Sequence, residues 1–177
     1  MTIIVNLYRG PGTGKSTNAA RLFSMLKDEG VEVELVTEYA KDLVWEDNLA
    51  TLDNQLFVFA NQHHKLYRLL DKVDVVITDS PLLLSVLYGR MNKDWTEEFE
   101  DFVQSVYSGF NNLDVMLERV KPYKSNGRLQ TEEEARELDN YINLLIDADM
   151  FVKGNKKGCK KIFKAVMKLL KSEHRDR

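Results

Sequence analysis

The stretch Arg9-Gly10-Pro11-Gly12-Thr13-Gly14-Lys15-Ser16-Thr17 lies between a short apolar run and an amphipathic run. The apolar run, residues 3–8, is typical of a buried strand, and residues 15–28 have the apolar spacing of a helix. Strand, glycine-rich loop and helix in this order predict a phosphate-binding P-loop, in which backbone N–H groups and the helix N-terminus bind the anion. Lys15 would reach the outer phosphates, and the Ser16 hydroxyl would bind Mg²⁺.

One position departs from the full G-x-x-x-x-G-K-[ST] pattern, because the first glycine of the pattern falls on Arg9. Arg9 is either a tolerated departure or a further cation near the phosphates. The remainder of the motif is intact. The residues expected to bind the nucleotide are Gly10, Pro11, Gly12, Thr13, Gly14, Lys15, Ser16 and Thr17.

The bulk composition indicates one soluble globular domain over residues 1–177, with 44% apolar and 30% charged residues. No apolar run approaches the roughly 18 residues that a membrane span needs. A single cysteine, Cys159, excludes an internal disulfide, which is typical of a reducing compartment. We therefore expect a cytoplasmic protein without a membrane partner.

Charge is distributed unevenly along the chain. Residues 153–177 contain ten basic and two acidic residues, although the whole chain has a net charge of −3. Two interpretations stay open, a solvated lysine-rich face on a terminal helix and a contact surface for phosphate or DNA.

Apolar periodicity predicts five strands that alternate with helices. The strands are expected at 3–8, 31–36, 73–78, 113–118 and 149–152, and the helices at 15–28, 39–48, 52–71, 81–88, 95–107, from 131 onward, and 156–172. In the helix at 52–71, residues Leu56, Ala60, Tyr67 and Leu70 are expected to share a face. Such alternation predicts a parallel sheet with helices on both faces, and ligands bind at the carboxyl ends of its strands.

Charged residues follow three of these strands. Glu38 follows the second strand, Asp79 the third and Arg119 the fourth, and Arg128 lies nine residues further on. Phosphoryl transfer needs a phosphate cradle, Mg²⁺, a base for the acceptor and cations for the developing charge. Asp79 is a candidate Mg²⁺ ligand or a helix N-cap, and Glu38 is a candidate base or a first-turn carboxylate.

Arg119 and Arg128 bracket a polar loop, and arginines on such a loop can close over phosphates. On the acceptor side, Tyr39 and Ser80 adjoin the two acids, and the Gln62 amide could hydrogen-bond a nucleobase. The candidate acceptor-binding residues are therefore Glu38, Tyr39, Gln62 and Ser80.

The whole chain resembles the P-loop kinases of the nucleoside and nucleoside-monophosphate kinase class, and within it the ribosylnicotinamide-kinase-like and phage-type nucleotide kinases. The resemblance rests on residues 10–17, Thr37-Glu38-Tyr39-Ala40, Thr78-Asp79-Ser80-Pro81, and residues 119–134. It implies a three-layer α/β fold whose five-stranded parallel sheet has the order 2-3-1-4-5, with a lid at about 119–131.

The resemblance further implies ATP with Mg²⁺ as the phosphoryl donor, Lys15 as a catalytic cation, Arg119 and Arg128 as lid arginines, and either Glu38 or Asp79 as the base. The leading hypothesis is thus transfer of the ATP γ-phosphoryl group to a nucleoside- or nucleotide-type acceptor. A kinase of hydroxymethylated pyrimidine bases within DNA, contacting DNA through the basic C-terminal helix, is one alternative. A regulatory P-loop ATPase without an acceptor is the other.

Overall fold

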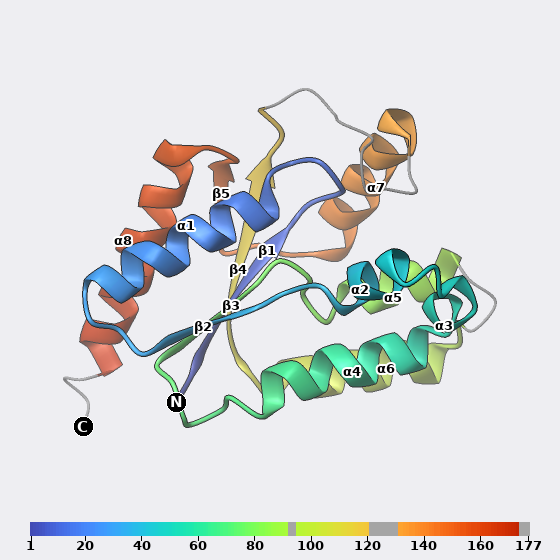
Figure 1. Ribbon diagram of the computed structural model, residues 1–177, viewed down its shortest axis with the longest axis horizontal. Coiled ribbons are helices and arrows are strands. Elements are labelled where there is room, and N and C mark those ends of the chain that lie inside the picture. Colours follow the sequence, from blue (N-terminus) through green and yellow to red (C-terminus); the bar gives the residue numbers. More distant parts are fainter. Residues whose placement is uncertain (92–94, 121–130, 174–177) are drawn as a thin grey trace.

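The computed structural model describes residues 1–91, 95–120 and 131–173 (Figure 1). Its centre is a five-stranded sheet in the order β2-β3-β1-β4-β5, with every neighbouring pair parallel, and this confirms the predicted fold. The strands are β1 (Ile3–Tyr8), β2 (Val33–Val36), β3 (Val75–Thr78), β4 (Asn111–Glu118) and β5 (Met150–Lys153).

Helices cover both faces of the sheet (Figure 1). Apolar side chains of α1 (Lys15–Asp28) and α8 (Lys156–Glu173) pack on one face, together with Ile3, Val5 and Leu7 of β1. The alternate β1 residues, Ile4 and Tyr8, pack on the other face. That face is covered by α4 (Gln55–Tyr67), α5 (Leu84–Met91), α6 (Glu97–Ser108) and α7 (Glu132–Leu145). Because every β1 residue is buried, this strand fixes the start of the P-loop in the middle of the molecule.

The register of the sheet brings the ends of β2 and β3 together. Val36 pairs with Thr78, so Glu38 and Asp79 follow neighbouring strands within two residues of that pair. Glu38 is the residue before α2 (Tyr39–Trp45), and α3 (Leu49–Asp53) continues from there. The two predicted acids therefore lie at the same sheet edge as the P-loop.

The helix predicted at 52–71 was wrong in its limits, and its regularly spaced apolar residues do not form the buried face of α4. The helix is interrupted at Asn54. The Asn54 side chain accepts a hydrogen bond from the Phe57 N–H and so caps the N-terminus of α4. Leu56 and Tyr67 are exposed, whereas Gln62 is buried. The apolar count misplaced the face because buried positions of α4 include the amide side chains of Gln55 and Gln62.

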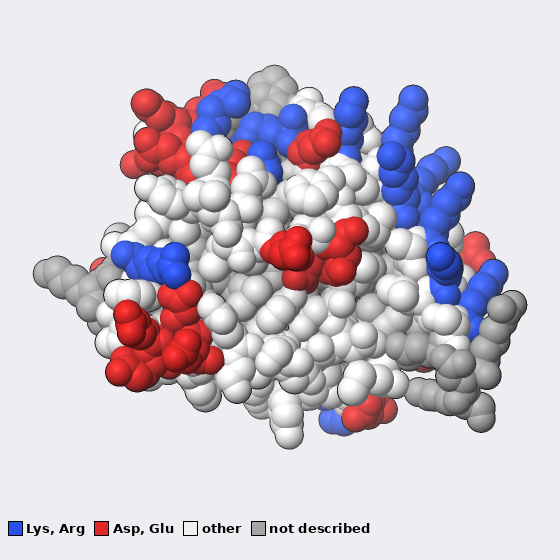
Figure 2. Space-filling view, turned by 180° about the vertical axis from the view of Figure 1, so that it is seen from behind, with Lys and Arg blue, Asp and Glu red and all other residues white. Residues whose placement is uncertain are grey.

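The lysines of α8 form one exposed face, which Figure 2 shows as a group of blue side chains at the right of the view. Its members are Lys156, Lys157, Lys160, Lys161, Lys164, Lys168 and Lys171. The helix follows β5, the edge strand opposite β2, and packs on α1. Among the described helices, none has the length and apolar character needed to cross a membrane.

Candidate active site

The P-loop leaves β1 and ends at the N-terminus of α1. Gly12 and Gly14 have φ angles of 82° and 90°, a region that L-residues with side chains rarely occupy. Gly14 is the N-cap of α1, and it supplies no side chain to the free N–H groups of the first helical turn, which also lacks acidic residues. These N–H groups and the helix dipole thus suit an anion at this end of α1.

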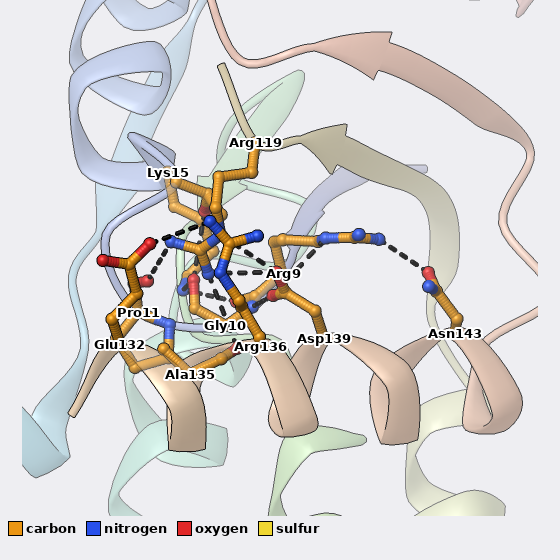
Figure 3. A network of polar contacts seen from close by, with 11 residues as sticks. Arg9, Gly10, Pro11, Lys15, Arg119, Glu132, Ala135, Arg136, Asp139 and Asn143 are labelled. Atoms are coloured by element: carbon orange, nitrogen blue, oxygen red, sulfur yellow. Dashed lines mark hydrogen bonds and ion pairs between the residues drawn. The ribbon is translucent and has the colours of Figure 1, made fainter. Parts of the chain in front are cut away.

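Lys15 lies across the first half of the loop. Its Nζ donates hydrogen bonds to the Arg9 carbonyl at 2.6 Å and to the Gly10 carbonyl at 3.4 Å (Figure 3). Burial lowers the pKa of the Lys15 ammonium, although the carboxylates of Glu38, Asp79 and Asp139 act in the opposite direction. The lysine that the motif predicts at the phosphates is therefore held near the loop and close to three acids.

Arg119, the residue after β4, is bound to the outside of the P-loop. Its Nη1 donates to the Pro11 carbonyl at 2.9 Å, and its Nε and Nη2 donate to Asp139 Oδ2 at 3.1 and 3.0 Å. The structure thus places the predicted arginine beside the loop, with its guanidinium shared between the loop and α7. The other predicted lid arginine, Arg128, lies outside the described residues.

Asp139 on α7 is the residue that the sequence argument missed. Its carboxylate is buried, with 5% of the residue exposed, and its Oδ1 accepts a hydrogen bond from the Gly10 N–H at 2.7 Å. One signal was present in the sequence, because Asp139 is an acid between Ala135 and Ile142 on the apolar side of the predicted helix. Acids at such positions are rare unless they are paired.

Arg9, the departure from the P-loop pattern, points away from Lys15 (Figure 3). Its Nη1 donates to Asn143 Oδ1 on α7 at 2.7 Å, and its Nε lies 3.4 Å from Asp139 Oδ1. The arginine thus binds α7 from the strand–loop junction, which accounts for its tolerance at a position where the pattern has glycine.

On the other side of Lys15, Glu38 and Asp79 form a pair of half-buried and buried acids. Burial raises the pKa of the Glu38 carboxyl, the Lys15 ammonium opposes this, and the Asp79 carboxylate adds to it. The Glu38 side chain does not cap α2, so the helix does not use this carboxylate. Burial and the Glu38 charge together raise the pKa of Tyr88 on α5, which places that hydroxyl in the same neighbourhood.

Asp79 is 6% exposed, and its Oδ1 is buried without a hydrogen-bond partner among the described residues. A buried carboxylate oxygen of this kind needs a cation or water. It fits Mg²⁺, which keeps several waters and takes one or two protein ligands together with substrate phosphates. Ser16, in the exposed first turn of α1, would be the second protein ligand.

Gln62 connects the two strand ends that precede these acids. Its Oε1 accepts a hydrogen bond from the Tyr39 N–H at 3.0 Å, and its Nε2 lies 3.4 Å from Thr78 Oγ1. The same Thr78 hydroxyl accepts from the Ser80 N–H at 3.1 Å. The amide that we expected at a nucleobase thus has partners within the protein, and it positions Tyr39 and Ser80.

The sequence matches a known protein family. A model of the AAA_28 family, described as an AAA domain, matches residues 5–148. The chain belongs to the AAA_28 family. The match spans the P-loop, Glu38, Asp79, Arg119 and Asp139, whereas β5 and the lysine face of α8 lie beyond it.

Solved structures share the fold of this AAA_28 chain at low sequence identity. A mutant of the Mycobacterium tuberculosis APS kinase CysC is 15% identical, with a TM-score of 0.52, over 96% of this chain and 97% of that chain. The crystal structure of APE1195 is 18% identical, with a TM-score of 0.50, over 94% of this chain and 95% of that one. The comparison with curated proteins found no match. These likenesses show that the chain shares the α/β fold of the two structures.

In this AAA_28 chain, the described residues contain no cluster of three or more His, Cys, Asp or Glu side chains able to hold a metal ion by themselves. Mg²⁺ bound to nucleotide phosphates needs no such cluster, since the phosphates supply most of its charged ligands.

Proposed function

We propose that this chain is an ATP- and Mg²⁺-dependent phosphotransferase that moves the γ-phosphoryl group to a hydroxyl of a small, nucleoside-type acceptor. One observation carries the proposal. The P-loop lysine lies close to an acid with a raised pKa, Glu38, and to a buried acid with an unpartnered oxygen, Asp79. A half-buried acid with a raised pKa that does not cap its helix is suited to take the proton of an attacking hydroxyl.

In this proposal Glu38 is the base and Asp79 is the metal ligand. The acceptor hydroxyl gives its proton to the Glu38 carboxylate, and its oxygen forms a bond to the γ-phosphorus. The bond between that phosphorus and the β–γ bridging oxygen breaks, and the electron pair leaves with ADP. Mg²⁺ bound by Ser16 and Asp79 would offset charge on the phosphates, while Lys15 and the α1 N-terminus stabilise the transferring group.

The charges favour a hydroxyl acceptor over a phosphorylated one. Lys15 and Arg119 both donate to carbonyls of the P-loop, which binds the donor in this proposal. The acceptor side holds the carboxylates of Glu38 and Asp79, which would repel an incoming phosphate monoester. The position of the lysine face does not favour DNA as the acceptor, because α8 follows the edge strand opposite β2 and Glu38.

The test is to incubate the protein with Mg²⁺ and γ-labelled ATP in the presence of separate pools of nucleosides, nucleoside monophosphates and modified-base DNA. We expect label to move to a free nucleoside-type alcohol. Label in a monophosphate pool would keep the phosphotransferase but overturn the hydroxyl assignment. Release of inorganic phosphate alone, unchanged by any pool, would overturn the kinase proposal in favour of a regulatory ATPase.

A further inference from the structure

We propose that Asp139 is a positioning residue that fixes Arg119 and the first half of the P-loop for binding the nucleotide phosphates. This inference rests on the P-loop being the nucleotide site of the proposed function. It concerns a residue on α7, 129 positions from the Gly10 N–H that it contacts.

The two carboxylate oxygens of Asp139 have separate partners (Figure 3). Oδ1 accepts the Gly10 N–H at 2.7 Å and lies 3.4 Å from Arg9 Nε. Oδ2 accepts from both Nε and Nη2 of Arg119, at 3.1 and 3.0 Å. One buried acid therefore joins the strand–loop junction, the loop backbone and the arginine after β4.

Gly10 is packed tightly against α7. A Cβ built on Gly10 would lie 2.6 Å from Asp139 Oδ1 and 2.6 Å from the Ala135 carbonyl oxygen. On its other side the Gly10 carbonyl lies 3.4 Å from Lys15 Nζ. Gly10 is thus held between α7 and Lys15, and only a residue without a side chain fits there.

Asp139 also influences charge within the loop. It is buried next to two arginines, and without its negative charge Arg119 would lose the partner of two of its N–H groups. Removal of one member of a buried ion pair leaves the other charge uncompensated.

The experiment compares Asp139→Asn with the exposed α7 control Glu137→Gln, using titration with MgADP. In Asp139→Asn the side-chain oxygen can still accept the Gly10 N–H, but the amide cannot pair with Arg119. We expect MgADP binding to weaken roughly tenfold or more, the range for a lost charge-assisted hydrogen bond. Glu137→Gln should bind as wild type.

A merely structural role would lower the melting temperature, and its effect on MgADP binding would not depend on Arg119. In the proposed role the effect depends on Arg119, so that Asp139→Asn costs less than threefold in MgADP affinity when introduced into an Arg119→Gln background. Folded Asp139→Asn protein with wild-type affinity, or with the same loss of affinity in both backgrounds, would overturn the inference.

If Asp139→Asn fails to fold, Asp139→Glu keeps the charge but displaces the carboxylate. It should bind MgADP more weakly than wild type, and wild-type affinity in this variant would equally overturn the inference. Wild-type protein that binds no MgADP would instead remove the proposed function on which the inference rests.

Discussion

The two sides of the candidate site, which the proposed function assigns to the donor and the acceptor, differ in how their charges are satisfied. On the donor side, Lys15 and Arg119 donate to loop carbonyls, and Asp139 pairs with Arg119 and with the loop backbone. On the acceptor side, Asp79 has a buried oxygen without a described partner, and Glu38 does not cap its helix. The donor half is thus built before any ligand arrives, whereas the acceptor half keeps its carboxylates available for a ligand and a metal.

The largest effect is expected from the removal of the Lys15 ammonium. Lys15→Ala should lower the rate of phosphoryl transfer by roughly 10³-fold, because the outer phosphates lose their mobile positive charge. Its melting temperature should stay close to that of wild type, since Lys15 makes only two loop hydrogen bonds. Steady-state kinetics and thermal melts check both, with exposed Lys72→Ala as the control. Retained turnover would contradict the P-loop assignment.

Glu38→Gln tests the acceptor half, with Glu34→Gln on the exposed side of β2 as its control. We expect kcat to fall about 10²-fold, the usual contribution of a general base, with the KM for ATP little changed. The base must be ionised, so wild-type kcat should fall with decreasing pH through a pKa above the ordinary value for glutamate. That acidic limb should vanish in the variant.

The same substitution should stabilise the ligand-free protein. A carboxyl whose pKa is raised on folding stabilises the folded state at low pH, and this contribution is lost as pH rises through the folded pKa. At neutral pH the variant should therefore melt a few degrees higher, a gain on the order of 1 kcal/mol. A lower melting temperature with normal kcat would assign Glu38 to structure.

Asp79→Asn should weaken the binding of Mg²⁺ and leave the binding of the acceptor unchanged. We expect about a tenfold rise in the Mg²⁺ concentration that gives half-maximal rate, with partial recovery of kcat at high Mg²⁺. The exposed α6 residue Asp101 supplies the control Asp101→Asn. A Mg²⁺ dependence identical to wild type would place the metal elsewhere.

The smallest effect on chemistry is expected from Gln62→Leu, which removes the link between the two acceptor-side strand ends. Loss of its bonds to Tyr39 N–H and Thr78 should reduce the free energy of unfolding by about 1–2 kcal/mol. Denaturant unfolding measures this, with Asn61→Ala as a neighbour whose amide bonds only within α4. A large loss of kcat without a loss of stability would instead return Gln62 to the predicted role in nucleobase binding.

Much of the fold followed from local pattern. Residues 3–17 combine a strand, a glycine-rich loop and a helix start, and the structure forms each element as predicted. The strand ends placed Glu38 and Asp79 beside the loop, because parallel strands deliver their carboxyl ends to one edge. These inferences needed only sequence neighbours and the general rules of parallel sheets.

Tertiary contacts account for what the sequence argument missed. Asp139 acts on Gly10 through the way that α7 returns across the loop, and no local pattern encodes that path. Arg9 likewise finds Asn143 only after the chain has folded. In α4 the apolar periodicity is interrupted by buried amide side chains. Gln62 is buried because it hydrogen-bonds the Tyr39 N–H and the Thr78 hydroxyl near the ends of two strands.

The turn between β5 and α8 packs against the P-loop, so the segment that follows it belongs to the folding unit. A Cβ on Gly154 would lie 2.6 Å from the Thr13 carbonyl oxygen, so this turn forms the back wall of the P-loop. Val152 before the turn and Cys159, Ile162 and Val166 after it complete the apolar layer under α1. The family match ends at residue 148, before all of these residues. A chain shortened to the matched segment would expose one side of α1, so the autonomous domain extends past the family boundary and includes α8.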